Sequence, residues 1–193
     1  MKKRYSFGFK IEDKPETKTC QGLEGGDFTK QNTTRSLTRF YIAYGSNLNV
    51  RQMKIRCPKA RLMGTAILEN HILYFRGSIT GSYLTIEPKI GASVPVAVWE
   101  VTPSDEKALD RYEGYPNFYY KQDYTLQVKS MDKTKETTLD CFTYVMRSDR
   151  PIGIPSDYYV YTCLEGYEYF GFDKRILINT VDRMRRILCK RMK

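Results

Sequence analysis

Histidine is almost absent from this chain of 193 residues, in which His71 is the single one. Catalytic arrangements built on a histidine base, and zinc sites built on histidine and cysteine, are therefore not favoured. The five cysteines do not change this, because they are odd in number, widely spaced, and form neither a C-x-x-C pair nor a cluster with the histidine. We expect no metal site and no cofactor.

Long apolar runs are also missing. The basic start, residues 1–8, is not followed by the apolar stretch of a secretory signal, and no later segment is apolar for the length that a membrane-spanning helix needs. Scattered cysteines without a secretory signal are typical of a reducing compartment. We therefore expect a cytoplasmic protein that does not enter a membrane.

Tyrosine, in contrast, is abundant, with 16 residues. Its apolar ring and polar hydroxyl make it suitable for lining a pocket. Hydrophobic residues make up 41% of the chain and charged residues 28%, close to the averages for globular proteins. A chain of this length has room for one ordinary domain with a real core, or for such a domain and a tail.

The net charge of +10 is concentrated at the two ends of the chain. Residues 1–40 carry a net charge of +4, residues 41–173 one of −1, and residues 174–193 one of +7. A basic protein suggests nucleic acid as a partner, but here that hypothesis can concern only the ends. The simpler interpretation of the last segment is a helix that docks through an apolar stripe and leaves its basic face in solvent. The stripe consists of Leu177, Val181, Met184, Leu188 and Met192.

The pattern along the chain divides it into three parts. Residues 1–38 show no sustained period and are expected to be an N-terminal extension, partly ordered at best. Residues 39–172 are expected to form an α+β domain, and residues 173–193 a basic amphipathic helix. Strands are predicted at 39–44, 60–68, 71–77, 83–87, 94–102, 118–129 and 137–145. Helices are predicted at 49–56, 106–112 and 157–170. About six strands with flanking helices indicate a mostly antiparallel sheet that is able to close into a small barrel.

The first confident strand runs into three small residues, Gly45, Ser46 and Asn47. Glycine tolerates a positive φ and a close approach of ligand to backbone, so such a turn can direct its amides outward to hold an oxyanion or a carboxylate. The alternative is an ordinary turn without a ligand, because these residue types are common in turns.

Glu113 is the candidate for acid–base chemistry. It closes a short predicted helix before Gly114, where the negative end of the helix dipole and aromatic neighbours would both raise its pKa. A carboxyl group with a raised pKa can take and return a proton near neutral pH. Two alternatives stay open: a solvated carboxylate at a helix end, or a carboxylate paired with Arg111 or Lys107, which would lower the pKa instead.

Four stretches of the chain occur in the order and at the spacing of one known family. They are Y-I-A-Y-G-S-N-L at 41–48, M-K-I-R-C-P-K-A at 53–60, V-W-E-V-T at 98–102 and L-D-R-Y-E-G-Y-P at 109–116. The chain resembles the γ-glutamylcyclotransferase-like family (AIG2-like and BtrG-like proteins) over roughly residues 39–172. This resemblance implies a small mixed barrel. It also implies an enzyme that converts a γ-glutamyl group to 5-oxoproline and releases an amine or amino acid, without a metal.

The resemblance also implies roles for individual residues. Glu113 matches the family's catalytic glutamate, a general acid and base. The turn matches the family's loop for the γ-glutamyl end, and three tyrosines match pocket positions, although core packing is an equally good reading of each tyrosine. The implied substrate-binding residues are Tyr44, Gly45, Ser46, Asn47, Leu48, Tyr119, Tyr144 and Tyr158. One departure is Val96, where family members often have glycine.

The sequence leaves alternatives for the function. The implied partner is a small γ-glutamyl substrate, but the leaving group shows no readable pattern. A member of the same fold that binds a metabolite or partner without catalysis is the second hypothesis. A binder of nucleic acid or an anionic surface through the basic ends is the third, and it is less favoured. Either a monomer or a homodimer is compatible with the sequence.

Overall fold

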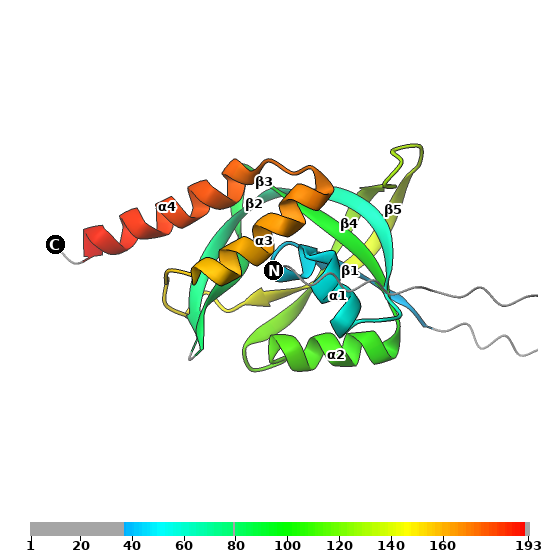
Figure 1. The fold of residues 1–193 in the computed structure, drawn as a ribbon, viewed down its shortest axis with the longest axis horizontal. Helices are drawn as coiled ribbons and strands as arrows, with labels where there is room; N and C mark the ends of the chain where they lie inside the picture. Colours follow the sequence, from blue (N-terminus) through cyan, green and yellow to red (C-terminus); the bar gives the residue numbers. More distant parts are fainter. Residues whose placement is uncertain (1–36, 79, 192–193) are drawn as a thin grey trace, which may run out of the picture. The chain divides into compact units, whose positions relative to one another are not determined.

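The computed structural model describes residues 37–78 and 80–191. The predicted N-terminal extension therefore lies almost wholly outside the described residues. Within them, five strands form a closed barrel in the order β1-β3-β2-β4-β5 (Figure 1). All neighbouring pairs are antiparallel except β1 and β5, which pair in parallel through Phe40 and Tyr41. The strands are β1 (Arg39–Ala43), β2 (Arg61–Ser78), β3 (Gly81–Val101), β4 (Tyr119–Lys129) and β5 (Glu136–Met146).

The two longest strands each join two segments that the sequence predicted as separate. The predicted strands 60–68 and 71–77 belong to β2, and 83–87 and 94–102 belong to β3. The pairing of β2 with β3 shifts its register between Glu69 and His71, next to Asn70 with a φ of 56°. Opposite this point, Gly91 has a φ of 76° and donates its amide to the side chain of Asn70. Two turn-like residues thus form an irregularity inside one continuous ribbon.

Capping residues mark the ends of the helices. The short 3-10 helix η1 (Ser46–Leu48) leads into α1 (Val50–Arg56), whose cap is Asn49, with its side chain accepting from the amide of Gln52. Helix α2 (Pro103–Glu113) starts at a complete capping box between Thr102 and Asp105 and stops at Gly114, which adopts the left-handed conformation at φ 65°. Helix α3 (Asp157–Phe170) is capped by Ser156.

Helix α3 lies directly over the loop that follows β1. A Cβ placed on Gly166 would lie 2.4 Å from the Cβ of Leu48 and 2.7 Å from its backbone carbonyl carbon. Because Gly166 has no side chain, the backbone of α3 can lie in direct contact with Leu48 of the loop. Leu48 is fully buried at this contact, so the loop is packed from behind.

Helix α4 (Lys174–Arg191) docks through the predicted apolar stripe. Leu177, Val181 and Met184 are buried and Leu188 is half-buried, while Met192 lies outside the described residues. The guanidinium of Arg183 donates to the backbone carbonyl of Leu73 in β2. Further along β2, Arg76 forms an isolated antiparallel bridge with Ile152. None of the described helices is both long enough and apolar enough to cross a membrane.

Candidate active site

A narrow cavity opens where β1 ends and α2 stops. We call it the inner cavity. It is lined by Tyr41, Tyr44, Gly45, Ser46, Asn47, Leu84, Glu113, Tyr119, Tyr144 and Tyr159. It widens into a second space, the mouth, which is lined by Ser46, Thr80, Tyr83, Arg111, Tyr112, Glu113, Gly114, Phe118, Tyr119 and Tyr159. The two spaces share Ser46, Glu113, Tyr119 and Tyr159, so Glu113 lies at their junction.

The carboxyl group of Glu113 is set up to exchange protons near neutral pH. Burial raises the pKa of Glu113 from 4.5 to about 7, against the opposing effects of the positive charge on Arg56 and a hydrogen bond from Asn47. That bond runs from Nδ2 of Asn47 to Oε1 of Glu113 over 3.0 Å. Neither Arg111 nor Lys107 forms an ion pair with Glu113 in the described part of the chain. Burial, which the sequence analysis expected from the aromatic neighbours, is the largest cause of the shift.

The tyrosines around the carboxyl group cannot compete with it as bases. Burial is the largest cause that raises the pKa of each one well above its ordinary value. These tyrosines are Tyr41, Tyr44, Tyr119, Tyr144 and Tyr159. Among the described residues that line the inner cavity, Glu113 is therefore the group that titrates near neutrality.

Asn47 connects the catalytic candidate to a residue that the sequence analysis did not select, Arg56. The amide nitrogen of Asn47 donates to the hydroxyl of Tyr41 over 2.8 Å as well as to Glu113. Its amide oxygen accepts from Nη1 of Arg56 over 2.5 Å. Because a guanidinium can only donate, it holds the oxygen of Asn47 on its own side and turns the NH2 group towards Glu113.

Arg56 is itself held at the end of α1. Its Nη2 donates to the hydroxyl of Tyr112 over 2.7 Å, and its guanidinium lies 3.7 Å from the centroid of that ring. It also bonds Gln52 one turn earlier. Arg56 lies within the motif at 53–60, but nothing in the sequence indicated which side chain it would meet.

Four of the five residues of the predicted loop line the inner cavity, and three of these are the small residues Gly45, Ser46 and Asn47. Gly45 has a φ of −118°, so a left-handed conformation is not the reason for glycine. A Cβ on Gly45 would lie 3.1 Å from the hydroxyl of Tyr159, so the glycine leaves room for that hydroxyl. Ser46 and Asn47 line the cavity, and Oγ of Ser46 lies 3.2 Å from the hydroxyl of Tyr112.

The other two loop residues serve the wall and the core. Tyr44 lines the cavity and donates its hydroxyl to the backbone carbonyl of Tyr144 over 2.5 Å. Leu48 does not line the cavity; its side chain is buried under α3 and its amide donates to the carbonyl of Gly45 over 2.9 Å. The structure therefore gives Leu48 a packing role behind the loop, and its predicted contact with a ligand stays a prediction.

Of the three predicted pocket tyrosines, two line the inner cavity. Tyr119 donates its hydroxyl to the carbonyl of Leu84 over 3.0 Å, and Tyr144 donates to Oδ1 of Asp110 over 2.7 Å. Tyr158 is 77% exposed and does not line this cavity. Its neighbour Tyr159 does, because one step along a helix turns the side chain by about 100°.

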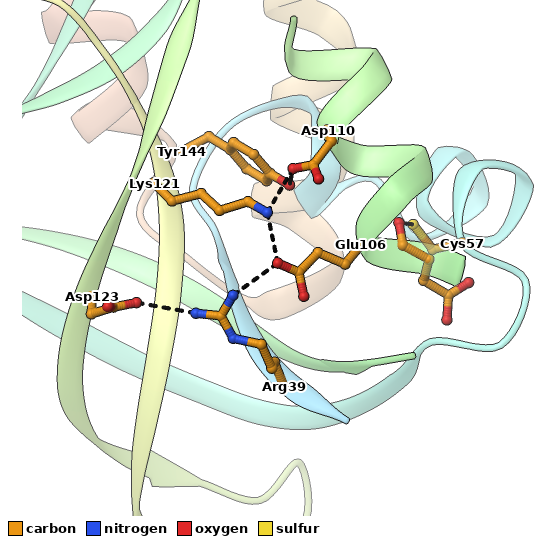
Figure 2. A network of polar contacts seen from close by, with 8 residues as sticks. Arg39, Cys57, Glu106, Asp110, Lys121, Asp123 and Tyr144 are labelled. Carbon is orange, nitrogen blue, oxygen red and sulfur yellow. Dashed lines mark hydrogen bonds and ion pairs between the residues drawn. The ribbon is translucent and has the colours of Figure 1, made fainter. Parts of the chain in front are cut away.

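A network of charged side chains fastens α2 to the barrel (Figure 2). Nζ of Lys121 lies 2.6 Å from Glu106 and 2.7 Å from Asp110, and Asp110 also accepts from Tyr144. Arg39 reaches Glu106 over 2.8 Å. Burial alone would lower the pKa of Lys121, but the two carboxylates outweigh it and raise that pKa. The network places the helix, and hence its last residue Glu113, relative to the cavity wall.

In the described residues, no group of three or more histidine, cysteine, aspartate or glutamate side chains is arranged to hold a metal ion. The polar groups that line the cavity are hydroxyls, backbone groups, one amide and one carboxyl group, set among tyrosine rings and Leu84. Such a set can bind a small polar group and move one proton.

Comparisons with known proteins address the family and the fold. A family model described as gamma-glutamyl cyclotransferase, AIG2-like matches residues 41–161. No curated protein matches the chain.

Solved structures share the fold. A structure described as a gamma-glutamyl cyclotransferase is 24% identical, with a TM-score of 0.64 over 74% of this chain and 86% of that one. YkqA from Bacillus subtilis is 18% identical, with a TM-score of 0.61 over 78% of this chain and 55% of its own. A yeast enzyme described as a gamma-glutamyl cyclotransferase specific to glutathione is 12% identical, with a TM-score of 0.53 over 76% of this chain and 96% of its own. At these identities the likeness establishes the fold alone.

Proposed function

The chain belongs to the gamma-glutamyl cyclotransferase, AIG2-like family, and we propose that it is an enzyme that cyclises a γ-glutamyl group to 5-oxoproline and releases an amine or amino acid. The observation that carries this proposal is the position of Glu113. It is a carboxyl group with a pKa of about 7, at the junction of a narrow polar cavity and a wider mouth.

The reaction needs a group that can take up and give back protons. The α-ammonium of the substrate gives a proton to the Glu113 carboxylate, and the free amine attacks the γ-carbonyl carbon. The new C–N bond closes a five-membered ring whose nitrogen carries one proton too many. Glu113 gives its proton to the leaving nitrogen as the C–N bond to that nitrogen breaks, and then takes the extra proton from the ring nitrogen and passes it to the departing amine or to solvent. General base catalysis of this type contributes on the order of 10²–10⁴ in rate. The proton returns within the cycle, so the scheme requires neither a metal nor a cofactor.

The inner cavity suits the γ-glutamyl end of the substrate. The amides of Ser46 and Asn47 open a short helical turn, and amides at that place have no partner within the turn. We propose that they donate to the oxygen of the γ-carbonyl, where loss of one donor typically costs about 3 kcal/mol of barrier. The close wall between Gly45 and Tyr159 supports a folded substrate, and holding the amine near the carbonyl supplies a further entropic gain.

The test is release of 5-oxoproline from a panel of γ-glutamyl compounds, measured by chromatography. Glu113→Gln should abolish release, because an amide cannot take the ammonium proton. Glu136→Gln, at an exposed position of β5, is the matched control and should leave the rate unchanged. Full activity of Glu113→Gln would overturn the mechanism. Stabilisation by γ-glutamyl compounds without any turnover would favour a non-catalytic binder of the same fold.

A further inference from the structure

Three of the tyrosines that line the inner cavity donate their hydroxyl protons to the protein itself. Tyr44 donates to the backbone carbonyl of Tyr144 over 2.5 Å, and Tyr119 donates to that of Leu84 over 3.0 Å. Tyr144 donates to Oδ1 of Asp110 over 2.7 Å. Because each proton already has an acceptor, the oxygen of each hydroxyl can only accept a further hydrogen bond.

Tyr144 differs from the other two in the group that receives its proton. The acceptors of Tyr44 and Tyr119 are backbone carbonyls, whereas the acceptor of Tyr144 is a carboxylate, which makes the stronger bond. Burial is the largest cause that raises the pKa of Tyr144, followed by the hydrogen bond to Asp110 and its charge, and the charge of Glu113 adds to them. The hydroxyl of Tyr144 therefore keeps its proton, and it lies within the electrostatic reach of Glu113.

Asp110 is held in turn from the barrel by Lys121 (Figure 2). Nζ of Lys121 lies 2.7 Å from Oδ1 of Asp110, the same oxygen that accepts from Tyr144. An ammonium can only donate, so the oxygen that it contacts is an acceptor. The proton between Asp110 and Tyr144 must therefore come from the hydroxyl, which points it towards Asp110.

Resting on the proposed function, we propose that Asp110, held by Lys121, is a positioning residue for Tyr144. It turns the hydroxyl proton of Tyr144 away from the inner cavity, so that the oxygen accepts a hydrogen bond from the α-ammonium of the γ-glutamyl group. Glu113 lines the same cavity, so the ammonium that Tyr144 holds is presented to the carboxylate that takes its proton. Tyr144 itself gives up no proton. A hydroxyl without Asp110 would be free to turn its proton towards the ammonium, and this hydrogen bond would be lost.

Two compounds of nearly the same shape separate this role from general packing. γ-Glutamyl-alanine carries the α-ammonium; glutaryl-alanine has hydrogen in its place, so it cannot cyclise and serves as a competitive inhibitor. Asp110→Ala removes the acceptor of the Tyr144 proton. It should lower kcat/KM for γ-glutamyl-alanine by about tenfold, the effect of one hydrogen bond to a charged group. The Ki of glutaryl-alanine should stay unchanged, because that compound has no ammonium to bind.

Two further variants test the direction of the hydroxyl. Asp110→Asn keeps an oxygen to which both Lys121 and Tyr144 can donate, because an ammonium turns the amide oxygen towards itself. It should therefore keep most of the wild-type kcat/KM. Tyr144→Phe removes the accepting oxygen and leaves Asp110 and Lys121 paired. It should lower kcat/KM for γ-glutamyl-alanine as Asp110→Ala does, again without a change in the Ki of glutaryl-alanine.

Glu106→Gln is the matched control for the attachment of α2. Glu106 is the other carboxylate on Lys121, at 2.6 Å, and it also pairs with Arg39. The variant loosens this attachment but leaves the contact between Asp110 and Tyr144 in place. Any loss that follows from a looser helix should therefore affect γ-glutamyl-alanine and glutaryl-alanine alike.

Each result separates this inference from the function on which it rests. Equal losses for the two compounds in Asp110→Ala, or no loss, overturn the positioning role; 5-oxoproline formed by the wild-type protein leaves the proposed function standing. A loss in Asp110→Asn as large as that in Asp110→Ala overturns the direction of the hydroxyl as the cause, and so does a loss confined to γ-glutamyl-alanine in Glu106→Gln. No 5-oxoproline from γ-glutamyl-alanine or from a wider panel overturns the proposed function and this inference with it.

Discussion

Replacing Glu113 with glutamine should make the protein more stable at alkaline pH. The pKa of Glu113 rises from 4.5 to about 7 because the folded protein buries its carboxyl group. Between those pH values the folded protein therefore binds the proton more tightly than the unfolded chain. The free energy of unfolding must fall as the pH rises through this window and become level above about 7.

The size of this penalty follows from the same values. A rise from 4.5 to about 7 corresponds to about 3 kcal/mol at pH 8. It is an upper value, because the side chain is partly open to the mouth. Glutamine carries no charge, and its carbonyl can accept the bond that Asn47 donates to Glu113. For a domain of this size the gain at pH 8 amounts to about 6–12 °C in melting temperature at most.

The assay is thermal unfolding followed by circular dichroism at about pH 5 and pH 8. The stability advantage of Glu113→Gln over the wild-type protein should grow by about 2–3 kcal/mol between the two conditions, because the wild-type penalty is mostly absent at pH 5. Glu136→Gln, which removes an exposed carboxylate, should show no such growth. An equal effect of Glu113→Gln at both pH values would refute the buried, high-pKa carboxyl group.

Two further predictions concern the cavity wall. The charge of Arg56 lowers the pKa of Glu113. Arg56→Gln should therefore move the rise of kcat/KM with pH to higher pH, whereas Arg56→Lys should largely keep the profile of the wild-type protein. An unchanged pH profile in Arg56→Gln would contradict the connection from Arg56 through Asn47 to Glu113. A Cβ at Gly45 would lie 3.1 Å from the hydroxyl of Tyr159, so Gly45→Ala should raise KM for a γ-glutamyl substrate by about tenfold, of the order of one lost contact. Adding Tyr159→Phe should recover part of that loss, and an additive loss would argue against the steric explanation.

Local chemistry made several elements predictable. Helix α2 was predicted at 106–112, and the capping box of Thr102 and Asp105 places its start three residues earlier, at Pro103. Ser156 fixed the start of α3, and the bounds of that helix match the prediction. The long strands were harder, because Asn70 and Gly91 have the residue types of a turn. Only the pairing of β2 with β3 shows that they form an irregularity within a ribbon.

The parts of the candidate site that consist of contiguous residues were predictable from the sequence. The parts that depend on the direction in which a side chain points were not. Glu113 and the turn at 45–47 lie in local motifs, and the structure brings them to one cavity. The choice of Tyr159 over Tyr158 depends on the rotation of α3 about its axis, which tertiary packing sets. Arg56 meets Asn47 across 9 residues of chain and Tyr112 across 56, and Lys121 meets Glu106 across 15. No pattern in the sequence encodes such meetings.

The way in which the edge of β2 is covered has a consequence for aggregation of the protein. An exposed strand edge is a template for pairing with another chain, and such pairing leads to aggregation. β4 pairs with β2 at Thr65, the segment around Ile152 bridges to Arg76, and Arg183 of α4 occupies the carbonyl of Leu73 between them. Helix α4 therefore covers part of the edge of β2. Removing α4 would expose this edge to pairing with other chains and would also remove the positive charge of the helix.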